Sequence, residues 1–355
     1  MGTIVLHAGM PKTGSSSIQH WLADNAGLLR SERDIGLMVV RNRVLEGEQH
    51  ARLTVEEYTS GGANSGGFAA AYLGFNRSRR LLDRFIEGVA GIAGRYPTTV
   101  ISSEYFAQFF AADRDDDPFL AALDELSRVH PVRVAYYFRA QDACLEALWR
   151  QSGFRLPAPP SAFVAEQADQ LDYLNTHVTV SERAPHVSFE MRPFRGDLLE
   201  GGSPVVDFAR HFLDAGELLR QAPDRRVNVG LPLELINLLR FAPKDIIDLD
   251  GHDGVRLRQL QRAFGDVQLP SSPKVARSRT VLAAYCHERF EAGNRALFRR
   301  LGRPAVDFVA CADVSPWELA ELDDLWCPDA SPAELALLYA ALNAAAGPRG
   351  AGGGR

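Results

Sequence analysis

Apolar residues along this chain follow two alternating patterns: short continuous runs, and stretches in which they recur every three or four positions. The continuous runs cover residues 3–8, 36–40, 98–103 and 132–138. Such runs are typical of strands buried on both faces of a parallel sheet. Between these runs, apolar residues recur at helical spacing, for example over residues 79–94. The alternation through residue 150 predicts an α/β fold with a central parallel sheet and helices on both faces.

The second half of the chain is mostly helical by the same criterion. A rigid Leu-Pro-Ala-Pro-Pro connector marks the change, and a further apolar run from residue 187 is expected to close the sheet. Helices are expected at 161–173, 207–213, 231–241, 254–264 and 278–300. We predict a single domain, 1–345, made of a core, 1–155, and a helical part, 156–345, followed by a disordered Gly-rich tail, 346–355.

Composition narrows the classes of protein that this chain can belong to. Its 355 residues are 46% hydrophobic, which suffices for a folded core, and its net charge is −6. That charge argues against a broad nucleic-acid or acidic-membrane surface. Four cysteines without paired spacing or a histidine cluster argue against a zinc site or a disulfide framework. No leader segment or apolar span is recognisable, so we expect a cytoplasmic protein; the oligomeric state cannot be predicted.

The most informative stretch is the passage from the first strand into the first helix. Gly9 and Gly14 bound a short loop that carries Lys12, and serines follow at positions 15–17, where a helix begins whose apolar stripe continues to Leu29. Unpaired N–H groups and the helix dipole favour an anion there, and Lys12 adds a positive charge. A nucleotide-binding loop of the Gly-x-x-x-x-Gly-Lys-Ser/Thr type would have its lysine after the second glycine. Here the lysine comes before it.

This arrangement resembles the 5′-phosphosulfate loop of sulfotransferases that use 3′-phosphoadenylyl sulfate (PAPS), and above all the bacterial sulfotransferase-domain proteins. The residues that carry the likeness are His7, Gly9, Lys12, Thr13, Gly14, Ser15 and Ser16. The resemblance implies a P-loop-like three-layer fold with PAPS at the strand ends. It also implies that the cofactor is held by Lys12, Thr13, Gly14, Ser15, Ser16 and Ser17.

A second patch with the same resemblance follows the strand at 132–138. In PAPS sulfotransferases this strand ends in an arginine that binds the 3′-phosphate, and a serine comes eight residues later. Arg139 fits the first position, and its guanidinium can grip a phosphate through two hydrogen bonds. The eighth residue after it is Ala147, so one hydroxyl donor of the family pattern is missing.

Two residues are candidates for the general base that deprotonates an acceptor. His50 lies in the polar, Gly-rich stretch at 41–67, which we expect to be a long loop, with Glu46 and Glu48 nearby. The resembled proteins have an acceptor-facing histidine in about this place, and histidine titrates near neutral pH. Glu104 follows the strand at 98–103, at the end of the sheet where ligands bind.

The expected activity is transfer of a sulfuryl group from PAPS to a hydroxyl or amine, with Lys12, His50 and Glu104 as catalytic residues and no metal ion. The acceptor stays open between a glycan, a lipid and a small metabolite. Two alternatives remain. One is a nucleotide-dependent P-loop kinase, although Lys12 is out of register for it. The other is a non-catalytic module that binds adenosine 3′,5′-bisphosphate (PAP), to which Ala147 points.

Overall fold

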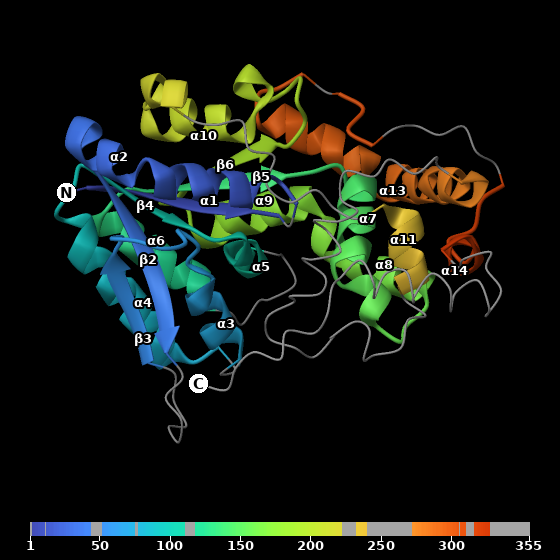
Figure 1. The fold of residues 1–355 in the computed structure, drawn as a ribbon, viewed down its shortest axis with the longest axis horizontal. Helices are drawn as coiled ribbons and strands as arrows, with labels where there is room; N and C mark the ends of the chain where they lie inside the picture. The colour runs from blue at the N-terminus through green and yellow to red at the C-terminus, as the bar shows by residue number, and fades with distance from the viewer. Residues whose placement is uncertain are drawn as a thin grey trace, which may run out of the picture. The chain divides into compact units, whose positions relative to one another are not determined.

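Residues 2–10, 12–43, 52–74, 77–110, 118–221, 232–239, 272–304, 306–309 and 316–326 are described by the computed structural model (Figure 1). Contacts divide the chain into two compact units. The first comprises 1–140, 170–225 and 292–308, and the second comprises 141–169, 226–291 and 309–355. Within the described ranges, no helix is both long enough and apolar enough to span a bilayer. The single domain predicted from the sequence remains a prediction.

The first unit is built on a six-stranded sheet with the strand order β3-β2-β4-β1-β5-β6. Its strands are β1 (Thr3–Gly9), β2 (Ile35–Arg43), β3 (Arg52–Glu57), β4 (Thr98–Ser102), β5 (Val132–Phe138) and β6 (Ser188–Pro193). All neighbours run parallel except β2 and β3. The predicted α/β class is therefore confirmed, and so are the four strands that were predicted from continuous apolar runs. These strands are apolar throughout because the sheet is covered on both faces.

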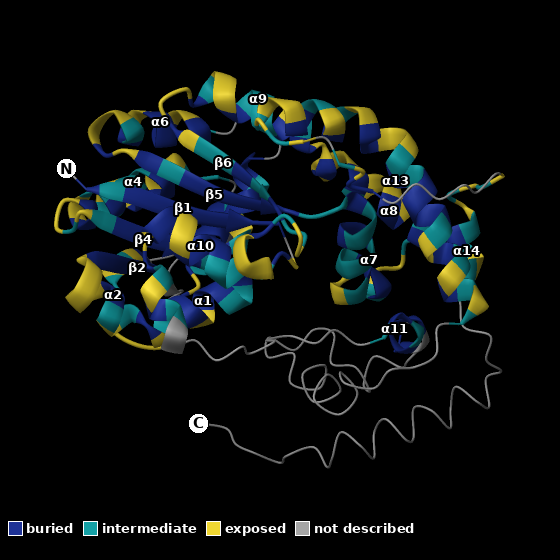
Figure 2. Ribbon diagram, turned by 90° about the horizontal axis from the view of Figure 1, so that it is seen from above, coloured by how far each residue is buried: buried dark blue, intermediate teal, exposed yellow. Residues whose placement is uncertain are grey.

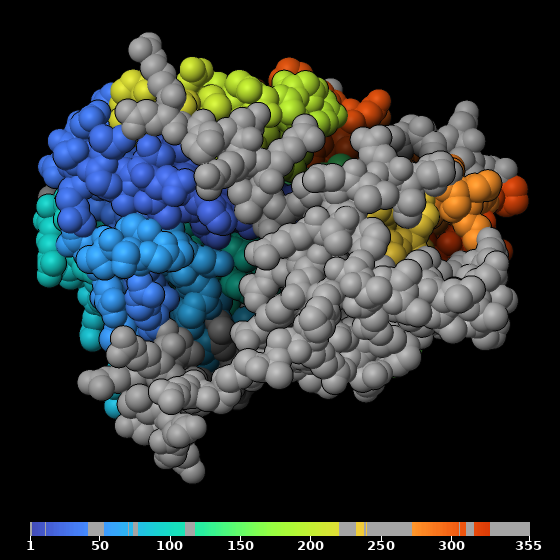
Figure 3. Space-filling model, viewed as in Figure 1, coloured from blue at the N-terminus to red at the C-terminus, as the bar shows by residue number. Residues whose placement is uncertain are grey.

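Helices cover both faces of this sheet (Figures 1 and 2). One face carries α1 (Ser15–Asp24), α2 (Ala26–Arg33) and α10 (Pro204–Leu213). The other carries α3 (Gly66–Gly74), α4 (Arg79–Ala93), α5 (Ala107–Phe110), α6 (Phe119–Val129) and α9 (Tyr173–Arg183). Helices α1 and α10 are far apart in the sequence but pack side by side. In the space-filling view the blue amino-terminal part of the surface adjoins the yellow to yellow-green part of the chain (Figure 3). The first unit is thus a three-layer arrangement.

The two helical layers bury different kinds of side chain against the sheet. Under α1, α2 and α10 the core is mainly aliphatic, with Leu22 and Val5 fully buried. On the opposite face the core is aromatic: the ring of Phe68 stacks on that of Phe85, with 4.1 Å between centroids. Burying each such side chain contributes about 1.5–3 kcal/mol, so both helical layers are held chiefly by apolar contact.

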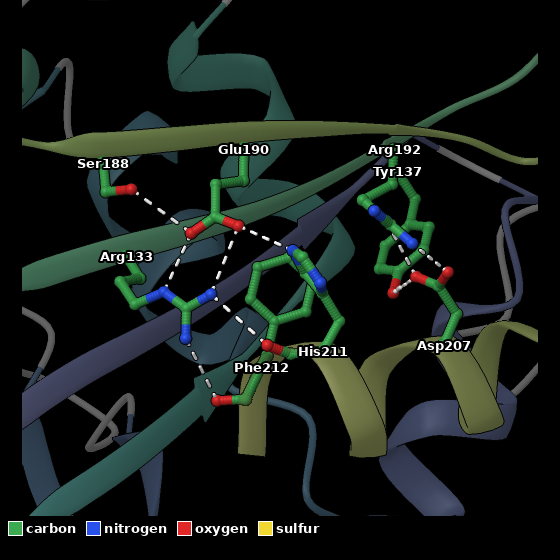
Figure 4. Close-up of polar contacts among 8 residues, drawn as sticks. All are labelled: Arg133, Tyr137, Ser188, Glu190, Arg192, Asp207, His211 and Phe212. Carbon is green, nitrogen blue, oxygen red and sulfur yellow. Dashed lines mark hydrogen bonds and ion pairs between the residues drawn. The ribbon is translucent and has the colours of Figure 1, made fainter. Parts of the chain in front are cut away.

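A buried carboxylate fixes α10 to the sheet (Figure 4). Asp207 is fully buried; it accepts hydrogen bonds from Tyr137 Oη at 2.7 Å and Arg192 Nε at 3.0 Å, and pairs with the Arg192 guanidinium. The backbone N–H of Glu200 also donates to it, at 3.0 Å. Burial raises the pKa of Asp207, but these donors outweigh burial and bring the pKa below its ordinary value.

A second ion-pair cluster lies one turn further along α10 (Figure 4). Glu190 accepts from Arg133 Nε at 2.8 Å and Nη2 at 3.2 Å, and pairs with His211 Nε2 at 2.8 Å. Arg133 also donates to the carbonyl of Phe212, at 3.5 Å. Because this cluster is partly exposed, solvent screens it, and the buried pair at Asp207 is the stronger anchor.

The second unit is helical where the structure describes it. It holds α7 (Gln141–Gln151), α8 (Pro160–Ala168), α11 (Leu233–Leu239), α14 (Glu321–Leu325) and most of α13 (Pro273–Arg300). Trp149 stacks on Trp326 with 4.9 Å between ring centroids and donates to Asn237 at 3.2 Å. Cys144 and Cys286 are buried. The helix expected at 254–264 and the tail at 346–355 lie outside the described residues.

Short 3₁₀ turns complete the described elements. They are η1 (Glu104–Phe106), η2 (Gly153–Arg155), η3 (Asp169–Leu171), η4 (Glu200–Gly202) and η5 (Gly216–Gln221).

The structure corrects two sequence expectations. The stretch at 41–67 is not one loop, because it contains β3, which pairs antiparallel with β2. Leu53 and Val55 turn toward the protein while Thr54 and Glu56 are exposed, so this is a half-buried edge strand too short for its period to stand out. The helix expected to continue to Leu29 is split at position 25 into α1 and α2.

We expect Asp207→Ala to lower the free energy of unfolding by about 3–5 kcal/mol, because the change leaves a buried guanidinium and a buried phenol without their acceptor. Chemical denaturation measures the loss. Asp197→Ala is the matched control, since Asp197 pairs with Arg195 on the exposed surface, and it should change stability little. Equal effects of the two substitutions would contradict the anchoring role of Asp207.

Candidate functional site

The loop that joins β1 to α1 is a tight turn held by hydrogen bonds to β5 and within itself. The N–H of Met10 donates to the carbonyl of Tyr137 at 2.8 Å, and the Thr13 hydroxyl donates to the carbonyl of Met10 at 2.6 Å. The N–H groups of Ser17 and Ile18 both donate to the Gly14 carbonyl, at 2.9 and 3.1 Å. No side chain caps α1, and among the described residues the N–H of Ser15 has no acceptor. The amino end of α1 therefore keeps its positive pole open to an anion.

Both glycines of this loop are required by close contacts. A Cβ on Gly9 would stand 2.6 Å from Thr13 Oγ1 and 2.7 Å from Ser15 Oγ. Gly14 has φ +81°, and a Cβ there would stand 2.6 Å from Cγ of Pro204, the first residue of α10. Helix α10 therefore packs directly onto the turn, and the site depends on its position.

Lys12 adopts a backbone conformation that is rare for residues other than glycine. Its φ is +67°, in the left-handed region, which costs about 1–2 kcal/mol for a residue with a Cβ. The side chain is exposed to solvent, yet surrounding protein atoms remove enough water from the ammonium to lower its pKa. The charge of Glu104 opposes this shift, and the charge of Arg139 adds to it. Lys12 is therefore a strained, partly desolvated cation between two charged groups.

Glu104 is held at the end of β4 by two amide side chains. It begins η1, whose first turn is capped by Ser103. Its Oε2 accepts from Gln19 Nε2 at 3.0 Å and from Asn64 Nδ2 at 3.3 Å. Asn64 is itself fixed, because its Oδ1 accepts from the N–H of Gly66 at 2.8 Å. The carboxylate consequently has a defined orientation near Lys12.

Gln19 and Asn64 were not identified as site residues from the sequence. Gln19 lies on the first helix at a position that reads as an ordinary polar residue, and Asn64 lies in the stretch that we expected to be a loop. Their common partner, Glu104, is 85 residues from one and 40 from the other. No local pattern could have linked them.

Arg139 also lies at the loop. It directly follows β5, and its Nη1 donates to the carbonyl of Lys12 at 3.3 Å. Its guanidinium lies 6.0 Å from the ring centroid of Phe194, and Tyr173 Oη donates to its carbonyl at 2.8 Å. One guanidinium nitrogen is thus used to hold the loop. Ala147 belongs to α7, in the second unit.

The structure brings together Lys12, Glu104 and Arg139, which follow the adjacent strands β1, β4 and β5. The serines at 15–17 begin α1 as expected, while the N–H groups of Thr13 and Ser17 donate within the loop. His50, Glu46 and Glu48 lie outside the described residues, so the part proposed for His50 stays a prediction.

Comparisons of the chain with protein-family models, with curated proteins and with solved structures gave no match. The functional argument therefore depends on the chemistry of the site. Two cations and an open helix terminus favour a bound anion, and an oriented carboxylate beside them can accept a proton. Among the described residues, no three His, Cys, Asp or Glu side chains are grouped to hold a metal ion.

His7 lies beneath this site, on β1. It is fully buried, and its Nδ1 pairs with Ser102 Oγ at 2.7 Å. The ring packs edge-on against Tyr137, with centroids 5.8 Å apart, and against Phe208 at 5.2 Å. Burial lowers the pKa of His7 to about 3, so the imidazole is neutral at physiological pH.

We expect His7 to make the protein sensitive to acid. Unfolded histidine binds a proton below about pH 6.5 whereas folded His7 does not, so the free energy of unfolding falls as the pH is lowered from 6.5 toward 3. The difference from a His7→Asn variant should shrink by about 1.4 kcal/mol per pH unit over that range. Denaturation at a series of pH values measures it. A constant difference would show that folded His7 takes up a proton normally.

Proposed function

We propose that this protein is a PAPS-dependent sulfotransferase with a P-loop-like donor site between β1 and α1. The observation that carries the proposal is the placement of Lys12 in the left-handed conformation at the open amino end of α1, with Arg139 and Glu104 beside it. A lysine before the second glycine distinguishes this loop from that of nucleotide hydrolases. The sequence resemblance to PAPS sulfotransferases points the same way.

Each residue of the site has its own part in the proposed reaction. The amino end of α1 and Lys12 hold the phosphosulfate end of the donor, and Lys12 stabilises the charge that develops on the oxygen leaving sulfur. Glu104, oriented by Gln19 and Asn64, accepts the proton of the attacking hydroxyl or amine. The acceptor oxygen or nitrogen forms the new bond to sulfur as the bond to the bridging oxygen breaks. Arg139 adds a second cation for the 3′-phosphate.

Binding and transfer assays test this proposal separately. Calorimetry with PAP should show binding, and a screen of acceptor extracts with radiolabelled PAPS should show transfer of sulfate. If PAP does not bind, the proposed function is wrong. If PAP binds and no acceptor is sulfated, the non-catalytic binding module becomes the better description. Magnesium-dependent hydrolysis of ATP or GTP would favour the kinase alternative.

We expect Lys12→Ala and Lys12→Gly to lower sulfate transfer by a hundredfold or more, the order of magnitude for loss of one group that stabilises transition-state charge. The glycine variant should be the more stable of the two by roughly 1 kcal/mol, because glycine accepts the left-handed conformation. Transfer assays and chemical denaturation measure the two effects. Lys274→Ala, a change on α13, is the control and should leave transfer intact. Normal activity without Lys12 would remove it from the mechanism.

We expect Glu104→Gln to lower turnover by roughly a hundredfold to ten-thousandfold, the range for loss of a general base. PAP affinity should change little, because a carboxamide oxygen can still accept from Gln19 and Asn64. Steady-state kinetics and calorimetry measure the two quantities, with the exposed Glu125→Gln on α6 as control. Unchanged turnover would move the base to another residue, of which His50 is the first to test.

A further inference from the structure

Tyr105 is a large aromatic side chain that stays exposed next to the proposed base. It follows Glu104 in η1 and is 42% exposed, whereas the next residue, Phe106, is fully buried in the aromatic core. Among the described residues, the Tyr105 hydroxyl has no hydrogen-bond partner. Of the large hydrophobic side chains described in the first unit, only Val129 is comparably exposed. Val129 ends α6 before β5 begins, so it lies at the opposite end of the sheet.

The ring of Tyr105 is held in place on one side. The backbone N–H of Tyr105 donates to Ser103 Oγ at 3.2 Å, and the N–H of the buried Ser103 donates to the carbonyl of His7 at 3.0 Å. A Cβ on Gly66, the first residue of α3, would stand 2.9 Å from Cδ2 and 3.1 Å from Cε2 of the ring. The ring therefore packs against the backbone of α3, and its exposed part does not have to be ordered when a ligand binds.

Asn64 connects this ring with the carboxylate of Glu104. Its Oδ1 would stand 3.2 Å from the same Cβ position on Gly66, and its Nδ2 donates to Glu104 Oε2 at 3.3 Å. The segment is fixed to the sheet, because the N–H of the buried Ser65 donates to the carbonyl of Ser102, the last residue of β4, at 2.8 Å. The Tyr105 ring and the Glu104 carboxylate are thus neighbours on either side of one amide.

Only one oxygen of Glu104 is used by the protein. Gln19 and Asn64 both donate to Oε2. Among the described residues no group donates to Oε1, which is also not one of the buried polar atoms without a partner, so solvent reaches it. A carboxylate with one oxygen held and the other open can orient a hydroxyl and accept its proton.

The surroundings of Tyr105 suit a sugar better than a lipid. The ring is accompanied by a carboxylate and two carboxamides, and the described part of the first unit exposes no other large hydrophobic side chain at this end of the sheet. A lipid acceptor would need a continuous apolar surface. A sugar has an apolar face of C–H groups and a rim of hydroxyls. An aromatic ring with a polar tip suits the face, and carboxamides suit the rim.

We propose that Tyr105 binds the acceptor and that the acceptor is a carbohydrate: one sugar ring packs on the exposed part of Tyr105, and a hydroxyl of that sugar or its neighbour lies at Oε1 of Glu104. The proton of this hydroxyl passes to Oε1 as its oxygen bonds to sulfur and the bond from sulfur to the donor oxygen breaks. The inference rests on the proposed function for the role of Glu104. Carbohydrate binding at Tyr105 can be tested without the donor.

Binding of neutral oligosaccharides tests Tyr105 directly. In saturation-transfer NMR with maltotetraose, cellotetraose and chitotetraose as probes, the ring protons of at least one should receive saturation from the unaltered chain. Tyr105→Ala should weaken its binding about tenfold through loss of the aromatic contact, whereas Tyr105→Phe should stay within about twofold. Val129→Ala, at the other exposed hydrophobic side chain, is the matched control and should change nothing. If none of the three probes binds, or Tyr105→Ala binds as well as the unaltered chain, the inference is wrong.

Transfer kinetics test whether the bound sugar lies at the reacting centre. With PAPS and the sugar that binds, Tyr105→Ala should raise KM for the sugar about tenfold, with kcat and PAP affinity little changed. A matching loss of PAP affinity would show a disturbed donor loop and overturn the assignment. Transfer only to 2-naphthol, or only to cholesterol in phosphatidylcholine vesicles, would refute a carbohydrate acceptor. If PAP does not bind at all, the proposed function fails, and the oligosaccharide measurements alone decide on Tyr105.

Discussion

The buried carboxylate of Asp207 is the constraint on which the donor loop depends. An isolated charge cannot be buried without large cost, so Asp207 must remain with Arg192 and Tyr137, and helix α10 must remain where these three meet. The position of α10 in turn brings Pro204 against Gly14 and Phe208 against His7. A charge interaction between α10 and β6 thereby determines the shape of a turn that follows β1.

Charge at the site is local rather than a property of the whole molecule. The chain carries a net charge of −6 and only three lysines, one of which is Lys12. An anion at the end of α1 is therefore favoured by the local charges of Lys12 and Arg139 and not by the charge of the whole chain. Glu104 beside them favours the charged form of Lys12, while burial and Arg139 oppose it.

Local sequence patterns predicted those parts of the fold whose cause is local. The strands β1, β4 and β5 are continuous apolar runs because both faces are covered, and their carboxyl ends placed Lys12, Glu104 and Arg139 at one edge. The edge strand β3 was missed because its two-residue period spans only six residues. From the sequence, Asp207 would be predicted to lie on the exposed face of a helix, and Gln19 and Asn64 would be predicted to have no specific role. Their roles depend on partners distant in the sequence, which no pattern of spacing reveals.

Departures from ordinary local preference gather in the β1–α1 loop. Buried polar atoms without partners also occur elsewhere, at Trp21 and Thr99 for instance, so such an atom alone does not mark a site. Left-handed residues with side chains also occur elsewhere: Asp34 and Asp214 end helices, where this conformation is common. Among the described residues, only this loop combines a lysine in the left-handed region, a helix start without a side-chain cap and two buried polar atoms without partners, at His7 and Ser15. The backbone strain and the unpaired polar atoms of this turn are unfavourable for folding. Such features are expected at a binding site whose geometry is preorganised for its ligand.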